Sequence, residues 1–177
     1  MSDFLFDIEA VRRREDPAMG YRYFVQVPVP SSASVKLEGM YVEDIQFQFP
    51  YHQQDTLVLN STVVHYAGRL QVPPITIRFY ESYRHIVSQA MEAWMSIIRN
   101  GDGTMKYGSE YKRNIYVQIL DSQGASVASY NFLDCFPLES SPFQMSYARS
   151  ERTTFTQTFS VDSVVKLFKE PLPRSQT

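Results

Sequence analysis

The chain has 177 residues, and its 17 Lys and Arg against 19 Asp and Glu give a formal net charge of −2. This length suggests one domain whose core is large enough to need no disulfide, and the single Cys135 has no partner for one within the chain. The small net charge argues against a protein that grips nucleic acid through a basic surface, and a chain that is 44% hydrophobic is too apolar to be disordered.

Residues 1–20 are predicted to form an N-terminal arm ahead of the folded domain. Asp16-Pro17 ends its amphipathic part, because the residue before a proline disfavours helical backbone. The arm has no basic residue near its start, so we expect no signal peptide. No apolar run approaches the ~20 residues of a membrane span, so we expect no membrane partner. The apolar side chains that would share one helical face are Phe4, Leu5, Ile8 and Val11.

Residues 21–29 and 41–49 are predicted to be the first two strands. In each of them apolar residues alternate with polar ones, which is typical of a strand with one buried and one exposed face. In the second strand the apolar side chains are Ile45, Phe47 and Phe49, and the polar side chains between them are Asp44, Gln46 and Gln48.

Residues 51–66 are β-branched and extended, yet they have no consistent apolar face. We expect a long hairpin loop that leaves the body of the domain. Its exposed apolar side chains would be an aggregation hazard in a monomer, so we expect them to dock on an adjacent subunit. These predicted interface residues are Leu57, Val58, Leu59, Val63 and Val64.

Residues 75–80 are predicted to resume the sheet, and residues 82–100 to form the main helix. The helical spacing of apolar residues, with Trp94 at the centre, predicts one face that covers the sheet and buries Trp94. Ser82 is a plausible N-cap. Asn100-Gly101 is expected to end the helix with a residue that tolerates positive φ.

The C-terminal half is predicted to be mostly strands. A hairpin is expected at 115–132, an irregular stretch at 134–142, and a flexible tail at 166–177, after a folded domain that spans 21–165. This pattern indicates a mainly β, α+β or barrel-plus-helix plan. The strands that we expect here are 115–120, 127–132, 143–147 and 155–165.

The sequence gives no support for catalysis, so we expect no enzyme, no metal and no cofactor. The three histidines are isolated, and Cys135 has the surroundings of a buried small hydrophobe. The glycine spacing from Gly103 to Gly108 resembles a P-loop, but Ser109 stands where that loop requires lysine. A small hydrolase on a β-barrel stays open as an alternative. The isolated histidines are His52, His65 and His85.

A polar face on the last strand carries more information. Thr156, Thr158, Ser160 and Asp162 point to one side, and Asp44, Gln46 and Gln48 form a similar polar row on the second strand. The ordinary interpretation is the solvent face of a half-buried sheet. The sharper hypothesis is a wall past which DNA slides, because these residues include no Lys or Arg to hold phosphates. Gln118 is a further candidate for this face.

Three stretches of the chain resemble bacteriophage tail tube proteins of the long-tailed, contractile type. The first is His65-Tyr66-Ala67-Gly68-Arg69 leading into residues 75–80, and the second is the helix at 83–100 with its Ala90-x-x-Ala93-Trp94 core. The third runs from residues 110–117 through Cys135-Phe136-Pro137 and 143–147 to 156–161. The final third of the chain is also similar to baseplate proteins that initiate the tube.

The resemblance implies a β-sandwich or barrel of two antiparallel sheets with one flanking helix. It also implies six copies in a ring, stacked rings with a continuous lumen, a tape-measure protein inside, and a sheath and baseplate as partners. Genomic DNA would be in transit only, and the location would be the tail tube of the virion. The open alternatives are a baseplate tube initiator or tube-end protein, and a secretion-system tube protein.

Overall fold

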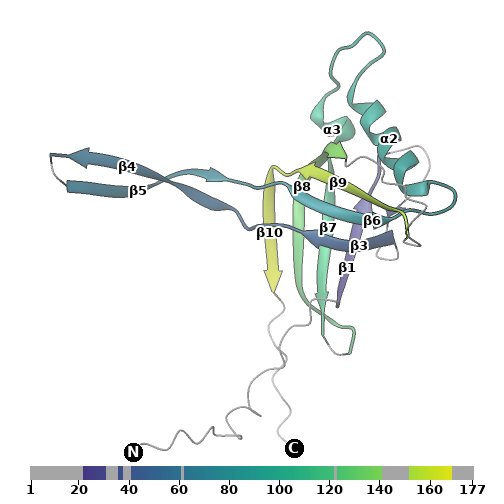
Figure 1. The fold of residues 1–177 in the computed structure, drawn as a ribbon, viewed down its shortest axis with the longest axis horizontal. Helices are drawn as coiled ribbons and strands as arrows, with labels where there is room; N and C mark the ends of the chain where they lie inside the picture. The colour runs from purple at the N-terminus through teal and green to yellow at the C-terminus, as the bar shows by residue number, and fades with distance from the viewer. Residues whose placement is uncertain are drawn as a thin grey trace, which may run out of the picture.

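The computed structural model describes residues 22–30, 36–37, 41–60, 62–121, 123–140 and 152–168. Three sequence predictions lie outside the described residues: the N-terminal segment at 1–20, the strand at 143–147 and most of the tail at 166–177. The described part is mainly antiparallel β-structure with a single long helix, which confirms the predicted fold class (Figure 1).

The body of the domain has two layers of antiparallel strands. Strands of the second layer run across those of the first (Figure 1), and β8 belongs to both. The first layer has the order β2-β1-β7-β8-β10 and comprises β1 Tyr23–Pro28, β2 Lys36–Leu37, β7 Arg113–Leu120, β8 Ser126–Ser140 and β10 Ser163–Phe168. The second layer has the order β8-β9-β6-β3 and adds β3 Val42–Gln46, β6 Ile75–Tyr80 and β9 Thr154–Ser160.

A bend in β8 joins the two layers. β8 pairs with β10 up to Leu133 and with β7 up to Cys135, and from Phe136 onward it pairs with β9. Asp134 lies at the bend with a φ of 54°, and its backbone N–H donates a hydrogen bond to Asn114 Oδ1 at 3.0 Å. The prediction of an irregular stretch at 134–142 is therefore wrong up to Ser140. A short polar side chain that tolerates left-handed backbone lets the strand turn a corner and continue.

The last predicted strand, 155–165, turns the same corner. The structure divides it into β9 and β10, and the backbone N–H of Asp162 donates to the carbonyl of Leu133 at 3.2 Å across the bend. β9 and β10 thus follow β8 from one layer into the other. The predicted hairpin of β7 and β8 is confirmed, with its turn at 121–125.

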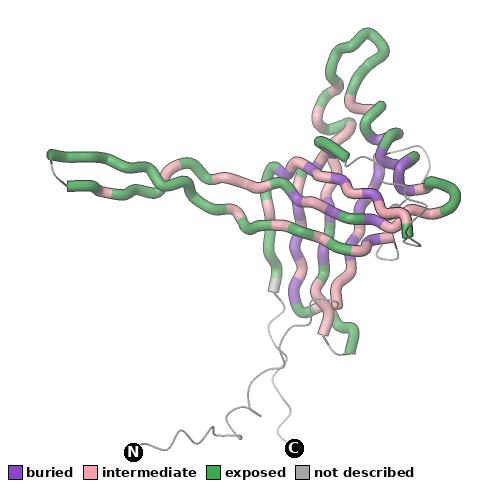
Figure 2. Tube along the Cα trace, viewed as in Figure 1, coloured by how far each residue is buried: buried purple, intermediate pink, exposed green. Residues whose placement is uncertain are grey.

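The hydrophobic core lies between the two layers (Figure 2). It is formed by the inward side chains that alternate with half-buried or exposed ones along β1, β6, β7 and β9. The largest fully buried side chains of the strands are Phe79, Phe132, Phe159, Leu37, Ile75, Ile77 and Ile115. This alternation explains why the sequence pattern located most of the strands.

The helix α2, Ile86–Ile98, covers one side of the core, and Trp94 is fully buried beneath it, as predicted. The Trp94 ring lies 5.6 Å from the ring of Phe159, centroid to centroid. Its Nε1–H donates a hydrogen bond to the carbonyl of Tyr111 at 2.7 Å. Tyr111 ends the short helix α3, Gly108–Tyr111, so Trp94 links both helices to the sheet.

The start of α2 differs from the prediction at Ser82. His85 is the N-cap, with a left-handed φ of 51°. The Glu81 carboxylate accepts hydrogen bonds from the backbone N–H groups of Val87 at 3.3 Å and Ser88 at 3.0 Å. Ser82 Oγ accepts one from Ile86 at 3.3 Å. A carboxylate is favourable here because it satisfies free N–H groups at the positive end of the helix dipole.

The end of α2 also differs from the prediction. The helix stops at Ile98, and Arg99 is extended with a β-bridge to Met105. Asn100 is not among the residues with positive φ; Gly103, further along the loop, has a φ of 86°. The bridge closes the loop onto itself, so no left-handed residue is needed at the helix end.

The predicted hairpin loop is a long two-stranded arm that leaves the body (Figure 1). It consists of β4, Tyr51–Leu59, and β5, Thr62–Gln71, and it continues from β3 and β6. The register shifts between His52 and Gln54. Opposite this bulge, the Asp55 carboxylate occupies the place where a Cβ on Gly68 would stand, with Oδ2 at 2.6 Å. Only glycine fits this close approach without displacing Asp55.

Within the described ranges, none of the helices has the length and apolar character needed to cross a membrane.

Candidate functional site

The two predicted polar rows lie on one continuous surface. Across β3, β6 and β9, the strand register places Asp44, Arg78 and Thr156 side by side, and in the next row Gln46, Thr76 and Thr158. We call this outward surface of the second layer the polar strip: Asp44, Gln46, Thr76, Arg78, Thr156, Thr158 and Ser160.

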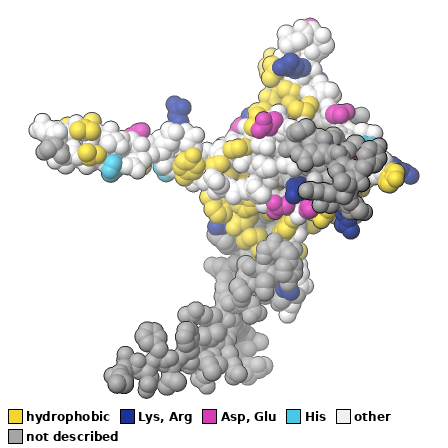
Figure 3. Space-filling model, viewed as in Figure 1, with side chains coloured by type: hydrophobic (Ala, Val, Ile, Leu, Met, Phe, Trp, Pro, Cys, Tyr) yellow, Lys and Arg dark blue, Asp and Glu magenta, His cyan; other side chains and the backbone are white. Residues whose placement is uncertain are grey.

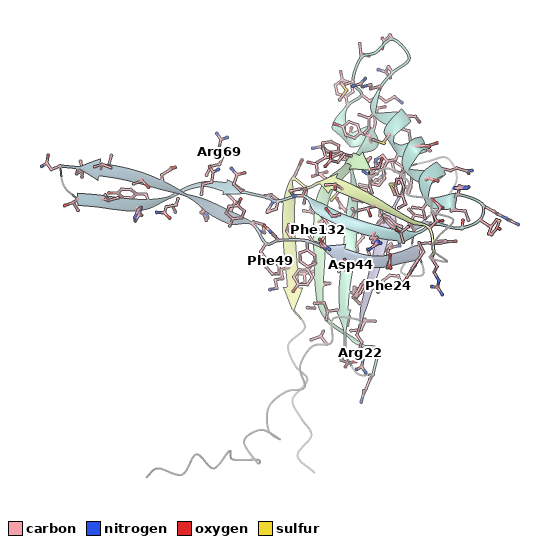
Figure 4. All side chains as sticks on the ribbon, in the orientation of Figure 1. Arg22, Phe24, Asp44, Phe49, Arg69 and Phe132 are labelled. Atoms are coloured by element: carbon pink, nitrogen blue, oxygen red, sulfur yellow. The ribbon has the colours of Figure 1, made fainter. Side chains whose placement is uncertain are left out.

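Burial along β9 agrees with the predicted division into two faces. Thr156, Thr158 and Ser160 are half-buried, whereas Phe155 and Phe159 face the core. Asp44 and Gln46 are exposed on β3, and Gln48 is exposed just beyond that strand. The Oγ1 atoms of Thr76 and Thr158 lie 3.4 Å apart, so the strip is joined across strands by hydroxyl groups as well as by backbone. Figure 4 labels Asp44 on the second layer.

The polar strip is not free of cations, which corrects the premise drawn from the sequence. Arg78 lies in its centre, where its Nε is 3.1 Å from Glu43 Oε2. At the end of β9, Lys112 forms an ion pair with Asp162, and this hydrogen bond raises the pKa of Lys112. The sequence alone did not place these two cations near the predicted rows, because Arg78 lies on β6 and Lys112 follows α3. Each has a carboxylate partner, so neither is an isolated positive charge.

Gln118 does not belong to the polar strip. It lies on the outward face of the first layer, on the wall of a hollow of about 320 Å³. The prediction that Gln118 adds to the same face is therefore wrong, because β7 belongs to the other layer. The residues that line this hollow are uncharged: Phe24, Gln26, Tyr116, Gln118, Ser129 and Asn131.

The predicted interface residues lie along the outer part of the arm. The register pairs Leu57 with Val64, Val58 with Val63, and Leu59 with Thr62. Leu57, Val58, Leu59 and Val63 are exposed and Val64 is half-buried, so at these positions the arm does not pack against the described part of its own domain (Figure 2). Their place in a subunit interface remains a prediction.

The sequence profile of a known family, described as phage tail tube protein, matches residues 28–165. This span includes the second layer, the arm and α2, and all of the first layer except most of β1 and the end of β10. The chain belongs to the phage tail tube protein family. The resemblance drawn from the sequence is thereby confirmed.

Solved structures show the same fold in related assemblies. The tube-terminating cap of the anti-feeding prophage is 15% identical, with a TM-score of 0.69 over 88% of this chain and 94% of that one. A chain of the sheath-tube complex of the extracellular contractile injection system PVC is 14% identical, with a TM-score of 0.66 over 88% and 94%. A chain of the anti-feeding prophage baseplate is 8% identical, with a TM-score of 0.64 over 88% and 98%.

No curated protein matches this tail tube protein in sequence.

Cys135, the single cysteine of the chain, does not belong to the polar strip. Its side chain is fully buried, as predicted, and its Sγ–H donates to the carbonyl of Phe132 at 3.3 Å. Burial raises the pKa of the Cys135 thiol to about 12. A thiol in this state is a core hydrophobe, since the thiolate is the reactive form.

We therefore expect Cys135 to resist a disulfide reagent such as DTNB in the folded protein at mildly alkaline pH. The buried thiol lacks both the charge and the access that the reaction requires. After unfolding in denaturant, one thiol per chain should react at the rate of a model peptide. Rapid reaction of the folded protein would show that the core opens at Cys135.

Two of the three histidines lie on the arm, and the third lies at the start of α2. On the arm, His52 Nδ1 lies 3.1 Å from the carbonyl of Gly68, and His65 contacts Gln54 and Thr56. His85 begins α2. Among the described residues, no three His, Cys, Asp or Glu side chains gather in a way that would hold a metal ion.

Tail tube proteins are structural, and that is the role to which the family assigns this chain.

Proposed function

We propose that this protein assembles into stacked hexameric rings that form a tail tube, through which DNA is delivered. The family match over residues 28–165 is the observation that carries this proposal. Two features of the chain support it: a broad polar surface on one layer, and an arm whose outer apolar side chains are exposed in the described part of the subunit. Assembly gives the arm a partner and the polar surface a channel to line.

The lumen is formed by the polar strip together with Gln48 and Asp162. Apart from Arg78, its side chains are small, neutral or acidic. Arg78 is paired with Glu43, and Lys112, which lies beside this surface, is paired with Asp162. A surface of this kind offers DNA no unpaired cation to hold its phosphates, so the duplex slides. Thr76 and Arg78 lie between the residues that the sequence assigns to the lumen, which are Asp44, Gln46, Gln48, Thr156, Thr158, Ser160 and Asp162.

Replacing Thr158 and Ser160 by lysine should slow genome release and leave tube assembly intact. Both positions are half-buried on the outward face, where a lysine stem can lie along the sheet and place its charge in the lumen. The new charges would bind phosphates, so higher salt should restore the release rate. The measurement is the rate of DNA ejection from particles that carry the variant.

The matched control is the replacement of Thr158 and Ser160 by glutamine, which adds bulk without charge. This variant should release DNA at the unmodified rate. Normal ejection from the lysine variant would remove the polar strip from the lumen, and so would a structure of the tube with these side chains on its outer surface.

The other partners in this proposal are a tape-measure protein inside the tube, and a sheath and baseplate outside it. The fold is shared with a chain of a sheath-tube complex and with a chain of a baseplate, which supports these two partners. The location is the tail of the virion. A secretion-system tube protein, which carries its cargo in the same kind of lumen, is the alternative from another class.

A ring at the end of the tube is the second candidate position. It is favoured by the fold shared with a tube-terminating cap. Electron microscopy of the purified protein tests both positions: a shaft subunit forms tubes many rings long, and a terminal subunit forms single rings or short stacks. A protein that stays monomeric at high concentration, alone and with its sheath and baseplate, would contradict the proposed function.

A further inference from the structure

The pairing of strands is interrupted where the arm joins the body. The last pair between β3 and β6 is Gln46 with Thr76, and the pair of β4 and β5 nearest the body is Tyr51 with Gln71. Two linkers lie between these pairs and belong to no strand, so the arm is a sheet separate from the body. The root of the arm is therefore not held by the hydrogen bonds of a continuous ladder.

The composition of the two linkers explains this interruption. The first linker is residues 47–50, and the second is residues 72–74. They contain Pro50, Pro73 and Pro74, which have no backbone N–H to donate to a ladder. A hollow of about 530 Å³ lies at this junction, with walls from both linkers and from the ends of β3 and β6. A junction with neither ladder bonds nor close packing on this side has the properties of a hinge.

On its other side, the first linker is held against the body by aromatic rings. The ring centroid of Phe47 lies 5.2 Å from that of Phe132 and 5.4 Å from that of Tyr130. The ring of Phe49 lies 5.6 Å from that of Tyr130 and 5.7 Å from that of Phe47. Tyr130 and Phe132 are buried side chains of β8, so the linker packs on the first layer. Figure 4 labels Phe49 and Phe132 at this junction.

Lys166 adds a cation to this aromatic cluster. It lies directly opposite Tyr130 in the pairing of β10 with β8, so the two side chains point to the same face. Its Nζ lies 4.6 Å from the ring centroid of Phe49 and 5.4 Å from that of Tyr130, within the range of a cation–π interaction. We call Phe49, Tyr130 and Lys166 the latch. Figure 3 shows hydrophobic side chains gathered on the body where the arm leaves it.

Phe49 is the member of the aromatic cluster whose position burial explains least. Its ring is 49% exposed, whereas Tyr130 is 6% exposed and Phe132 is 1% exposed. A ring that keeps half of its surface in water gains less from burial, so its contacts with Tyr130 and Lys166 carry more of what holds it. Loss of these contacts frees the first linker without opening the core.

We propose that Phe49 and Lys166 are positioning residues, which latch the arm in one direction relative to the body before the subunit assembles. The hinge allows the arm to swing, and the latch selects one orientation. An arm with a set direction loses less conformational freedom when the subunit assembles. The latch is a property of the single chain, and only its effect on assembly rests on the proposed function.

The distance between two spin labels on the free, full-length chain tests the latch. One label is attached at Glu92→Cys, an exposed position of α2, and the other at Arg69→Cys, an exposed position of β5 close to the body. The native Cys135 is buried and stays unlabelled. Double electron–electron resonance then measures the distribution of distances between the arm and the body. With the latch intact, this distribution should be a single narrow peak.

Two variants open the latch in this doubly labelled chain. Lys166→Gln removes the charge and keeps most of the stem, and Phe49→Leu removes the ring. Each should at least about double the width of the distance distribution, because the latched orientation loses its preference. Lys166→Arg keeps a cation over the rings and should keep the narrow peak. Leu167→Ala, at the next and exposed position of β10, is the matched control and should also keep it.

Unfolding in urea separates positioning from a structural role. Lys166 and Phe49 are exposed, so the midpoint of unfolding should barely change while the distance distribution broadens. Lys166→Gln alters only an exposed group and decides the test if Phe49→Leu does not fold. A broad distribution in the unmodified chain would overturn the proposal. An unchanged width in a folded variant would remove that residue from the latch.

Assembly gives a second measurement that keeps the two proposals apart. Both variants should need a several-fold higher protein concentration than the unmodified chain to form tubes. If the unmodified chain forms neither rings nor tubes while the label distances behave as expected, the proposed function fails and the latch stands. If tubes form and the label distances do not respond to either variant, the latch fails and the proposed function stands.

Discussion

Replacing Trp94 by alanine is expected to lower the free energy of unfolding by about 3–5 kcal/mol. The side chain is fully buried between α2 and the sheet, where it packs on Phe159. Removal of the ring leaves a cavity that a helix fixed at both ends cannot close, and it also leaves the Tyr111 carbonyl without its donor. The measurement is urea-induced unfolding of the free subunit.

Two further variants separate the causes. Trp94→Phe keeps much of the bulk and loses the hydrogen bond, so it should cost about 1–3 kcal/mol. Met95→Ala removes a side chain from the next position of the same helix, where it is exposed, and should cost well below ~1 kcal/mol. Trp94 is the only tryptophan, so its fluorescence reports on this site alone. A maximum at the wavelength of a solvent-exposed indole in the folded protein would contradict the burial of Trp94.

The parts of the fold that the sequence predicted are those in which one face is buried. Between Phe155 and Val161 buried and half-buried side chains alternate without interruption, although the buried Gln157 is polar, because the strand packs on a core by one side only. The same reasoning located α2 and the burial of Trp94 from the helical period. The arm was predicted because its β-branched residues lack the one-sided apolar pattern of a strand that packs on the core. The structure confirms that the arm leaves the body.

The rest depends on contacts between residues far apart in the chain. The bend of β8 interrupts its alternation, because Leu133 and Asp134 both point away from the core between buried Phe132 and Cys135. Because the alternation stops there, the sequence pattern resembles that of a loop. The hydrogen bonds from Glu81 to the start of the helix were missed because Glu81 lies before the expected start of the helix and its carboxylate reaches forward to Ser88.

The polar strip shows the same limit for the candidate site. The register places Asp44 and Gln46 on one surface with Thr156 and Thr158, but the strand between the two rows brings Arg78 into the strip. Sheet order decides which residues share a surface, and a single sequence does not contain it. The one signal available was that residues 75–80 also alternate, with Thr76 and Arg78 between buried residues.

Replacing Leu57, Val58 and Leu59 by serine should leave a folded subunit that no longer assembles. These side chains are exposed in the subunit, so the substitutions remove no contact within the domain, and the free energy of unfolding should stay within ~0.5 kcal/mol of the unmodified chain. In the tube, each fully buried aliphatic side chain contributes roughly 1.5–3 kcal/mol. The loss of three of them in each of six subunits should abolish tubes under conditions where the unmodified chain forms them.

Hydrogen exchange on free and assembled protein measures the same interface without substitution. The backbone of residues 51–66 should exchange rapidly in free subunits, because an isolated two-stranded sheet is marginally stable in water, and slowly in tubes. A variant with Thr56 and Thr62 changed to serine serves as the control, since it alters the arm at polar positions and should assemble normally. Equal protection of the arm in both states would mean that it packs on its own domain. That result would contradict the assignment of these apolar side chains to a subunit interface, because the tube would then be held together by contacts of the body alone.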